Sequence, residues 1–118
     1  MKLNSKIIII TGASSGIGKS LAVECAKRGA NLVLAARQYV TLCQLAEDLE
    51  KQYNIKALAV QCDVAVEQDC EQLIKQALTT FGKIDVLINN AGISMRALFQ
   101  DAKLDVLKTV MEIGRAHV

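Results

Sequence analysis

The chain has 118 residues, of which 52% are hydrophobic, 3% aromatic and 22% charged, and its formal net charge is +2. This composition is typical of a soluble α/β protein, and the scattered charges form no basic patch that would indicate a nucleic-acid partner. The apolar stretches are far shorter than the roughly 20 residues of a membrane span, and residues 1–5 do not resemble a secretory signal, so we expect no membrane association and a cytoplasmic location.

Strands and helices are predicted to alternate along the chain. In chain order, the periodicity predicts a strand over 6–11, a helix over 16–28, a strand over 31–36, a helix over 40–53, a strand over 56–62, a helix over 66–81 and a strand over 84–89. A further helix follows, with apolar residues at Leu104, Leu107, Val110 and Met111. Right-handed crossovers make such strands parallel, so we predict an α/β fold with a doubly wound parallel sheet, a three-layer α/β/α Rossmann fold truncated after the fourth strand and the following helix.

Three glycines mark the turn between the first strand and the first helix, in the sequence TGASSGIG at residues 11–18. Gly12 can adopt the positive φ of a tight strand exit, Gly16 lets a phosphate approach the backbone, and Gly18 lets the helix lie close to the sheet. The first amide groups of the helix have no partner within it, and they lie at the positive end of its dipole. The turn therefore predicts a pyrophosphate site at the carboxyl ends of the strands.

Each predicted helix carries an apolar face at helical spacing. These faces are Ile17, Leu21, Ala22, Cys25 and Ala26; then Leu42, Leu45, Ala46 and Leu49; then Cys70, Leu73, Ile74, Ala77, Leu78 and Phe81. Gly29 and Gly82 follow two of the helices, as C′ glycines do.

The four cysteines, Cys25, Cys43, Cys62 and Cys70, form no CxxC pair and have no histidine nearby, so we predict reduced, mostly buried thiols and no metal site.

Polar residues follow the predicted strands. Loops begin at such positions in any sheet, but here four consecutive strands share the feature. Arg37 stands where a protein that binds NAD carries an acid, and its guanidinium suits a 2′-phosphate, so the sequence favours NADP over NAD; the alternative is a solvated loop charge. Asp63 is suited to accept a hydrogen bond from the adenine amino group, and its alternative role is that of an acid before a helix.

Together, TGASSGIG at 11–18, Arg37, the CDV at 62–64 and the IDVLINNAG at 84–92 resemble the short-chain dehydrogenase/reductase family. The resemblance implies that residues 1–113 are the N-terminal part of a single NAD(P)-binding Rossmann domain. It implies hydride transfer between NADP(H) and a small-molecule carbonyl or alcohol, and a parent protein that forms a homo-oligomer. The residues it places along the cofactor are Gly12, Ser14, Ser15, Gly16, Ile17, Gly18, Arg37, Asp63, Val64, Asn90, Ala91 and Gly92. It also implies that NNAG steadies the sheet, and that Ser94 and Met95 lie nearer the nicotinamide and the substrate.

The chemistry that this resemblance implies requires a tyrosine, a lysine four residues later, a serine and an asparagine. Tyr39 and Tyr53 lack the lysine, and the asparagine is expected at position 114, where this chain has Gly114. We therefore assign no catalytic residue within the 118 residues, and we expect this polypeptide to reduce no carbonyl.

The last residues, 114–118, have no recognisable pattern. One permitted set of codons for residues 113–118 spells a common sequencing-library adapter, so we hypothesise that 114–118 is a non-native tail from adapter read-through. Later strands of such a sheet would lie beside the fourth strand. Without them, we expect residues 84–88 to form an exposed apolar edge and the isolated polypeptide to fold poorly.

Two other functions remain open at this point. Residues 13–20 read ASSGIGKS, a relaxed P-loop in which Lys19 would reach a γ-phosphate, Ser20 would hold Mg²⁺ and Asp63 would supply a second carboxylate. The strict pattern requires glycine at position 13, and this interpretation leaves Gly12, Gly16, Arg37 and NNAG without a role. The other possibility is a catalytically inactive dinucleotide-binding module. The presence or absence of the serine and the Tyr-x-x-x-Lys pair in the parent sequence would distinguish it from an enzyme.

Overall fold

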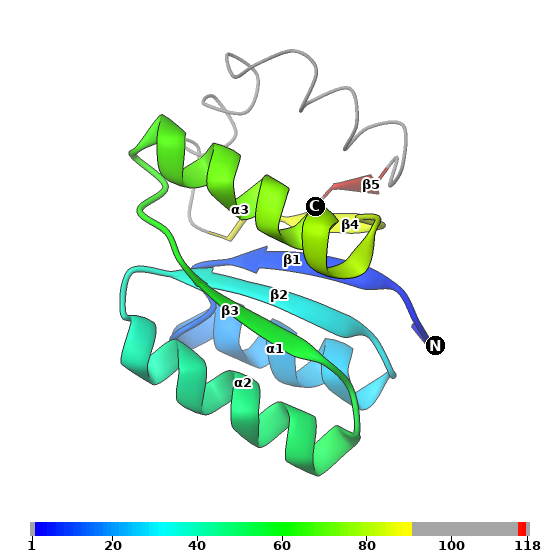
Figure 1. Cartoon of the computed structure of the whole chain (residues 1–118). Helices are drawn as coiled ribbons and strands as arrows, with labels where there is room; N and C mark the ends of the chain where they lie inside the picture. Colours follow the sequence, from blue (N-terminus) through cyan, green and yellow to red (C-terminus); the bar gives the residue numbers. More distant parts are fainter. Residues whose placement is uncertain (1, 91–115, 118) are drawn as a thin grey trace.

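The computed structural model describes residues 2–90 and 116–117, and it contains one parallel sheet between two layers of helices (Figure 1). The elements in chain order are β1 (Ile7–Thr11), α1 (Gly16–Lys27), β2 (Asn31–Ala36), α2 (Tyr39–Tyr53), β3 (Ala57–Gln61), α3 (Glu67–Phe81), β4 (Val86–Ile88) and β5 (Ala116–His117). The predicted bounds of the strands and helices up to β4 agree with these to within two residues.

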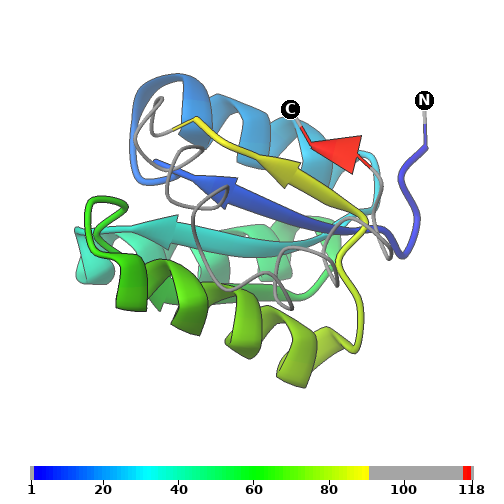
Figure 2. The same ribbon diagram turned by 90° about the horizontal axis from the view of Figure 1, so that it is seen from above.

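The sheet has the strand order β3-β2-β1-β4-β5, and all its pairs are parallel. Ile9 pairs with Val33 of β2 on one side and with Leu87 of β4 on the other, so β1 is central. The chain adds β2 and β3 outward from β1 and then returns across the sheet through α3 to place β4 on the opposite side of β1 (Figure 2). Such a reversal separates neighbouring loops and opens a crevice at the carboxyl ends of the strands.

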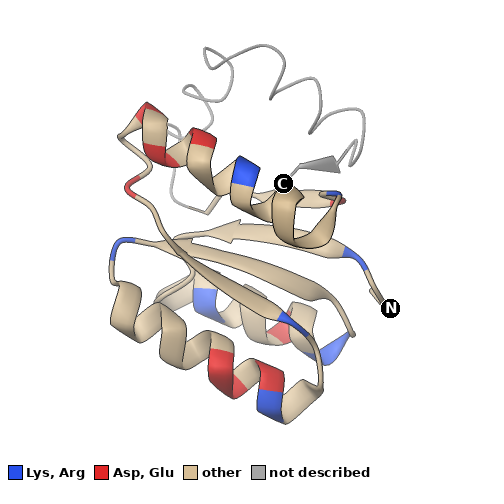
Figure 3. Ribbon diagram, viewed as in Figure 1, with Lys and Arg blue, Asp and Glu red and all other residues tan. Residues whose placement is uncertain are grey.

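The core has two halves, one on each face of the sheet. Ile7 and Ile9 pack in the cluster that includes the buried residues of α3, whereas Ile8 and Ile10 pack in the cluster formed with α1 and α2. Side chains of a strand alternate between the two faces, so β1 must be apolar throughout when helices cover both faces. Figure 3 accordingly shows the charged residues on the helices and in the connections between elements.

Apart from Ile17, the residues of the predicted helix faces are buried or, like Leu21, partly buried against the core. Ala22, Cys25 and Ala26 of α1 are buried, as are Leu42, Leu45, Ala46 and Leu49 of α2 and the first four residues of the α3 face. Leu78 and Phe81 pack against the core while partly buried. The prediction was wrong for Ile17, which lies in the first turn of α1 and is 71% exposed.

The fourth strand is tied to the start of the first. The Asp85 amide donates to the Ile7 carbonyl at 2.8 Å, and the Ile7 amide donates to Asp85 Oδ2 at 2.8 Å. Lys83 Nζ lies 3.2 Å from the same carboxylate oxygen. The Asp85 side chain therefore satisfies a backbone donor at the beginning of the central strand, where an unpaired buried amide would be costly.

The predicted open edge at residues 84–88 is wrong in part, since Val86 and Leu87 pair with Ala116 and His117 of β5. Ile84 and Leu87 are also buried, because α3 packs over this part of the sheet. The predicted helix around residues 104–111, Gly114 and most of the predicted tail lie outside the described residues. The hypothesis that 114–118 is non-native therefore stays a prediction.

The cysteines are free thiols, and three of them are buried: Cys25, Cys62 and Cys70. Cys43 is partly exposed on α2. Burial raises the pKa of Cys25, and contact with the Cys70 thiol followed by burial raises the pKa of Cys62. The thiolate is the reactive form of cysteine. Cys25 and Cys62 are therefore protected from alkylation both because reagents cannot reach them and because their thiols stay protonated.

We expect iodoacetamide to modify Cys43 of the folded protein at least about tenfold faster than the three buried cysteines. Peptide mass spectrometry of timed samples measures each rate separately. In urea all four sites should react at similar rates, which is the control. Equal rates in the folded protein would contradict the described packing.

Candidate functional site

The candidate site lies at the end of the sheet where Thr11 is found. Thr11 is the one fully buried polar side chain among the residues that the structure describes. It ends β1, and the connections after β1, β2, β3 and β4 all begin at this edge. The strand order reverses between β1 and β4, and the carboxyl ends at such a reversal are where doubly wound folds bind their ligands.

The turn after β1 leaves the start of α1 open. Gly12 and Gly16 have φ values of +63° and +58°, which L side chains adopt at a cost, and a Cβ on Gly16 would face open space. Ser15 is the N-cap of α1, but its side chain makes no capping hydrogen bond. The first amide groups of α1 therefore lie beside an open space at the positive end of a 12-residue helix, which is an arrangement suited to a phosphate.

Gly18 fixes the distance between α1 and this turn. A Cβ there would overlap the Gly12 carbonyl oxygen and would lie 2.7 Å from Asn90 Nδ2. Asn90 Nδ2 donates to the Gly12 carbonyl at 3.4 Å, and Thr11 Oγ1 donates to Asn89 Oδ1 at 3.3 Å. Residues from the end of β4 thus support the glycine turn directly, and the turn, α1 and β4 form one closely packed unit.

Two polar contacts hold the connection after β2, which contains Arg37. Ser14 Oγ donates to Gln38 Oε1 at 2.9 Å, so the glycine turn and this connection are linked. Gln61 Nε2, at the end of β3, donates to the Arg37 carbonyl at 3.3 Å. The Arg37 side chain is exposed, and a guanidinium in such a position is accessible to a phosphate.

The turn after β3 is ordered by carboxylates. The Ala65 amide donates to Asp63 Oδ1 at 3.0 Å, and the Asp63 amide donates to Asp69 Oδ2 at 2.9 Å. Asp63 therefore shapes the turn before α3, whose N-cap is Val66, and it is not the cap of that helix. Val64 packs against the core, and its carbonyl accepts a weak bond from Cys70 Sγ at 3.6 Å. Asp63 and Val64 thereby face the same end of the sheet as Arg37.

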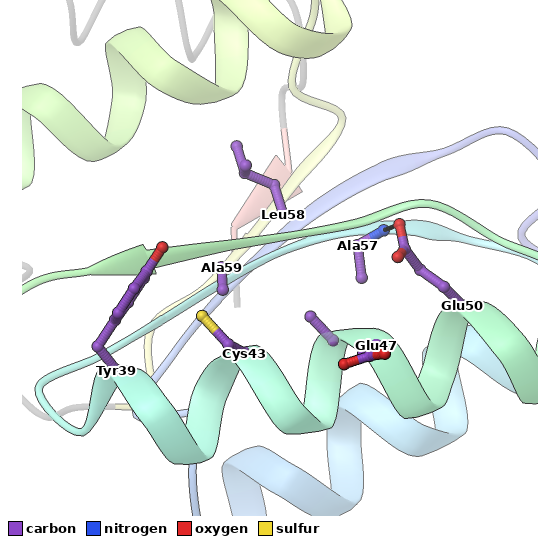
Figure 4. A pocket seen from close by; sticks show the side chains of 8 residues that line it. Tyr39, Cys43, Glu47, Glu50, Ala57, Leu58 and Ala59 are labelled. Atoms are coloured by element: carbon purple, nitrogen blue, oxygen red, sulfur yellow. Dashed lines mark hydrogen bonds between the residues drawn. The ribbon is translucent and has the colours of Figure 1, made fainter.

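Tyr39 does not have the environment of a proton donor. Contact with the Cys43 thiol raises its pKa, whereas a catalytic tyrosine requires a lowered one. The ring belongs to a separate cavity of about 250 Å³ between α2 and β3, which Figure 4 shows. That cavity is lined by Tyr39, Cys43, Ala46, Glu47, Glu50, Ala57, Leu58 and Ala59, and none of the predicted cofactor residues lines it.

Most of the predicted site residues meet at one edge of the sheet, on the elements already described: Gly12, Ser14, Ser15, Gly16, Ile17, Gly18, Arg37, Asp63, Val64 and Asn90. Ala91, Gly92, Ser94 and Met95 lie outside the described residues, as does Gly114. Gln38 and Gln61 carry no motif signal and were not predicted, whereas Asp85 lies within IDVLINNAG but was given no role of its own. Among the residues that the structure describes, no His, Cys, Asp and Glu side chains group as metal ligands would, and no helix is long and apolar enough to cross a bilayer.

Residues 6–115 match the model of the short chain dehydrogenase family. The chain is 44% identical over 98 residues to 11-beta-hydroxysteroid dehydrogenase A of Sesamum indicum, covering 83% of this chain and 28% of that protein. It superimposes with a TM-score of 0.77 and 28% identity on L-sorbose reductase of Gluconobacter frateurii in complex with NADPH and L-sorbose, covering 98% of this chain and 48% of that one. A short chain dehydrogenase/reductase of Burkholderia phymatum in complex with NAD gives a TM-score of 0.70 at 31% identity, covering 75% of this chain and 31% of that one.

The chain spans between 28% and 36% of the length of the curated relatives it matches. The matched part holds the glycine turn, Arg37, Asp63 and Asn90, that is, the ends of the first four strands.

Proposed function

The chain belongs to the short chain dehydrogenase family, and from that premise we propose that it is the coenzyme-binding part of an NADP(H)-dependent oxidoreductase. The observation that carries the proposal is the glycine turn, whose open space at Gly16 adjoins the uncapped start of α1. The amide groups there are suited to hold the two linked phosphates of a nicotinamide dinucleotide. A bound coenzyme would supply or accept the hydride.

The preference for NADP(H) is supported by Arg37. The acid that would accept a hydrogen bond from the ribose 2′-hydroxyl of NAD is absent at the end of β2, where Ala36 is followed by an exposed guanidinium. Arginine forms bidentate hydrogen bonds with a phosphate and remains charged at any physiological pH. The solved relatives include complexes with NADPH and with NAD, so the preference that we propose for this chain rests on Arg37.

The remaining predicted site residues are assigned to positioning the coenzyme. Asp63, Val64 and the exposed Ile17 border the site, and we assign Asp63 to the adenine amino group. Asn90 keeps the Gly12 carbonyl in place, and we extend the cofactor contacts to Ala91 and Gly92. No residue of this chain is assigned to proton transfer. The reaction proposed for the whole protein is reduction of a small-molecule carbonyl or oxidation of the corresponding alcohol.

Two further properties belong to this proposal. We expect the full-length protein to be a homo-oligomer, as the family resemblance implies, and size-exclusion chromatography with light scattering measures this. We also expect it to reside in the cytoplasm, in accord with its four free cysteines, because disulfides are rare where thiols are kept reduced.

Titration of the full-length protein with coenzymes tests the proposal. We expect NADPH to bind without Mg²⁺, at least about tenfold more tightly than NADH, because each charge-assisted hydrogen bond contributes about 1.5–3 kcal/mol. Protection against thermal unfolding and quenching of protein fluorescence are suitable measurements. Binding of ATP or GTP that requires Mg²⁺, with no binding of either nicotinamide coenzyme, would support the P-loop alternative instead.

The comparisons do not favour that alternative, because the family match includes the whole of residues 13–20 and Asn90. An inactive dinucleotide-binding module differs from an enzyme in the catalytic residues. A full-length sequence with the serine and the Tyr-x-x-x-Lys pair, together with turnover of NADPH, would support the enzyme; coenzyme binding without that pair would support the module.

A further inference from the structure

Two cysteines lie at the two ends of the short connection between β3 and α3. Cys62 follows the last residue of β3, and Cys70 is the fourth residue of α3, eight positions later. Both side chains are 1% exposed, and both belong to the core cluster under α3. The proposed function uses Asp63 and Val64 from this connection and gives the two thiols no role.

Hydrogen bonds hold the start of α3 against the end of β3. The Cys62 amide donates to the Ala36 carbonyl of β2 at 3.0 Å, which fixes the Cys62 backbone to the sheet. The Asp63 amide donates to Asp69 Oδ2 at 2.9 Å, so the residue after Cys62 is bonded to the residue before Cys70. The backbones on both sides are thus linked, and the two thiols are in contact.

The two thiols differ in their surroundings. Cys70 Sγ donates to the Val64 carbonyl at 3.6 Å, so this thiol is bonded to the connection itself. Contact with the Cys62 thiol lowers the pKa of Cys70, although burial and the Asp69 carboxylate act in the opposite direction, and the same contact raises the pKa of Cys62. The thiolate is the nucleophile in thiol oxidation, so Cys70 is the sulfur that attacks and Cys62 is the sulfur that resolves.

We propose that Cys62 and Cys70 form a dithiol that a hydroperoxide converts to a disulfide, and that this disulfide weakens coenzyme binding at Asp63 and Val64; the second part rests on the proposed function. With hydrogen peroxide, the Cys70 thiolate attacks one oxygen, the O–O bond breaks, and a sulfenic acid and hydroxide form. The Cys62 sulfur then attacks the Cys70 sulfur, and the sulfenic oxygen leaves as water with the Cys62 proton. In total, two thiols lose two electrons and two protons, and the peroxide becomes two molecules of water.

The burial of the pair restricts which reagents reach it. Hydrogen peroxide is much smaller than iodoacetamide, and the pair lies beside a short connection in which Ala65 and Val66 are exposed. Local opening of this connection would admit a small oxidant without unfolding the core. Cys25 is also buried, but it packs in the cluster on the opposite face of the sheet and has no place in this chemistry. Where thiols are kept reduced, disulfides are usually transient and redox-sensing.

Closure of the disulfide would change the connection that borders the coenzyme site. The reduced Cys70 thiol donates its proton to the Val64 carbonyl, and a disulfide has no such proton to donate. A disulfide also brings the two sulfur atoms to about 2.05 Å, which is shorter than any contact between separate thiols. The end of β3 and the start of α3 would therefore move toward each other, and Asp63 and Val64 would shift with them.

Peptide mass spectrometry of the full-length protein tests the disulfide. Trypsin releases residues 57–75 as one peptide with both cysteines, because no Lys or Arg lies between Lys56 and Lys75. After treatment with hydrogen peroxide, denaturation and alkylation, we expect this peptide to carry no alkyl group and to be two hydrogen atoms lighter than the reduced peptide. Dithiothreitol should restore both alkylation sites, and Cys25 should be alkylated throughout. Two alkyl groups on the peptide, at a peroxide concentration that oxidises Cys43, would overturn the disulfide.

The Kd of NADP⁺ before and after oxidation tests the link to the coenzyme site. We expect it to rise about three- to tenfold with peroxide, through the loss of one hydrogen bond, and to return with dithiothreitol. The double variant Cys62→Ala/Cys70→Ala keeps Cys25 and Cys43 and is the matched control, so peroxide should leave its Kd unchanged. A disulfide with an unchanged Kd, or an equal rise in the double variant, would overturn the link. If the reduced protein binds neither coenzyme, the proposed function is overturned, while the peptide analysis still decides the disulfide.

Discussion

Gly18→Ala should destabilise the protein and abolish coenzyme binding. The added methyl group would overlap the Gly12 carbonyl oxygen, in the turn that we propose to hold the phosphates, and would lie 2.7 Å from Asn90 Nδ2, which supports that turn from the end of β4. Overpacking of this kind typically costs about 1–3 kcal/mol. Alanine in a helix is otherwise favourable by about 1 kcal/mol over glycine, so the expected loss runs against helix propensity. Thermal unfolding and coenzyme titration of the full-length variant are the measurements.

The matched control for this variant is Gly82→Ala. Gly82 has a φ of +78° after α3, and a Cβ there would meet nothing within 4 Å. Strain at the left-handed position should cost about 1–2 kcal/mol of stability, while the coenzyme affinity should be unchanged. A Gly18→Ala protein that binds the coenzyme as tightly as the Gly82→Ala protein would show that α1 does not pack on the glycine turn as described.

Arg37→Ala should remove the preference for NADP(H). We expect the Kd of NADPH to rise about 10- to 150-fold, the loss that corresponds to about 1.5–3 kcal/mol from hydrogen bonds to a charged group, and the Kd of NADH to change by less than about twofold. The exposed position of Arg37 means that the substitution removes no core packing, so the unfolding temperature should stay the same.

Lys75→Ala removes the same charge from an exposed position on α3 and serves as the comparison. It should leave both Kd values unchanged, which separates a local contact from the effect of net charge. An equal loss of NADPH affinity in the two variants would mean that Arg37 acts only through the general field of the protein, and the assignment of the 2′-phosphate would be withdrawn.

The elements and the glycine turn were predictable from the sequence because their signals are local. The Ile7–Ile10 run has the composition of a strand covered on both faces, the stripes of α2 and α3 repeat at helical spacing, and the positive φ of Gly12 follows from its place in the turn. The placement of Arg37 and Asp63 at the same end of the sheet also follows from topology alone, since consecutive parallel strands end at one edge of a sheet.

The contacts around the site were not predictable in the same way. Ser14 with Gln38, Gln61 with Arg37 and Asp85 with Ile7 join residues 24 or 78 positions apart, and each depends on strand register and side-chain direction rather than on a local pattern. Ile17 shows that a local pattern can also mislead. Its spacing fits the buried face of α1, but it lies in the first turn of the helix and is exposed, so periodicity alone wrongly assigned it to the core.

The links between β1 and the end of β4 have a consequence for biosynthesis. Ile7 bonds with Asp85, Thr11 with Asn89, and Gly12 with Asn90, so each pair is separated by 78 positions. The ribosome synthesises the chain from its N-terminus. The earlier residue of each pair therefore leaves the ribosomal exit tunnel well before the later residue has been translated. On a nascent chain the turn at Gly12 therefore lacks its Asn90 support while β1, β2 and β3 are already available to pair. The proposed dinucleotide site would therefore be complete only after the fourth strand has been synthesised and has packed against β1.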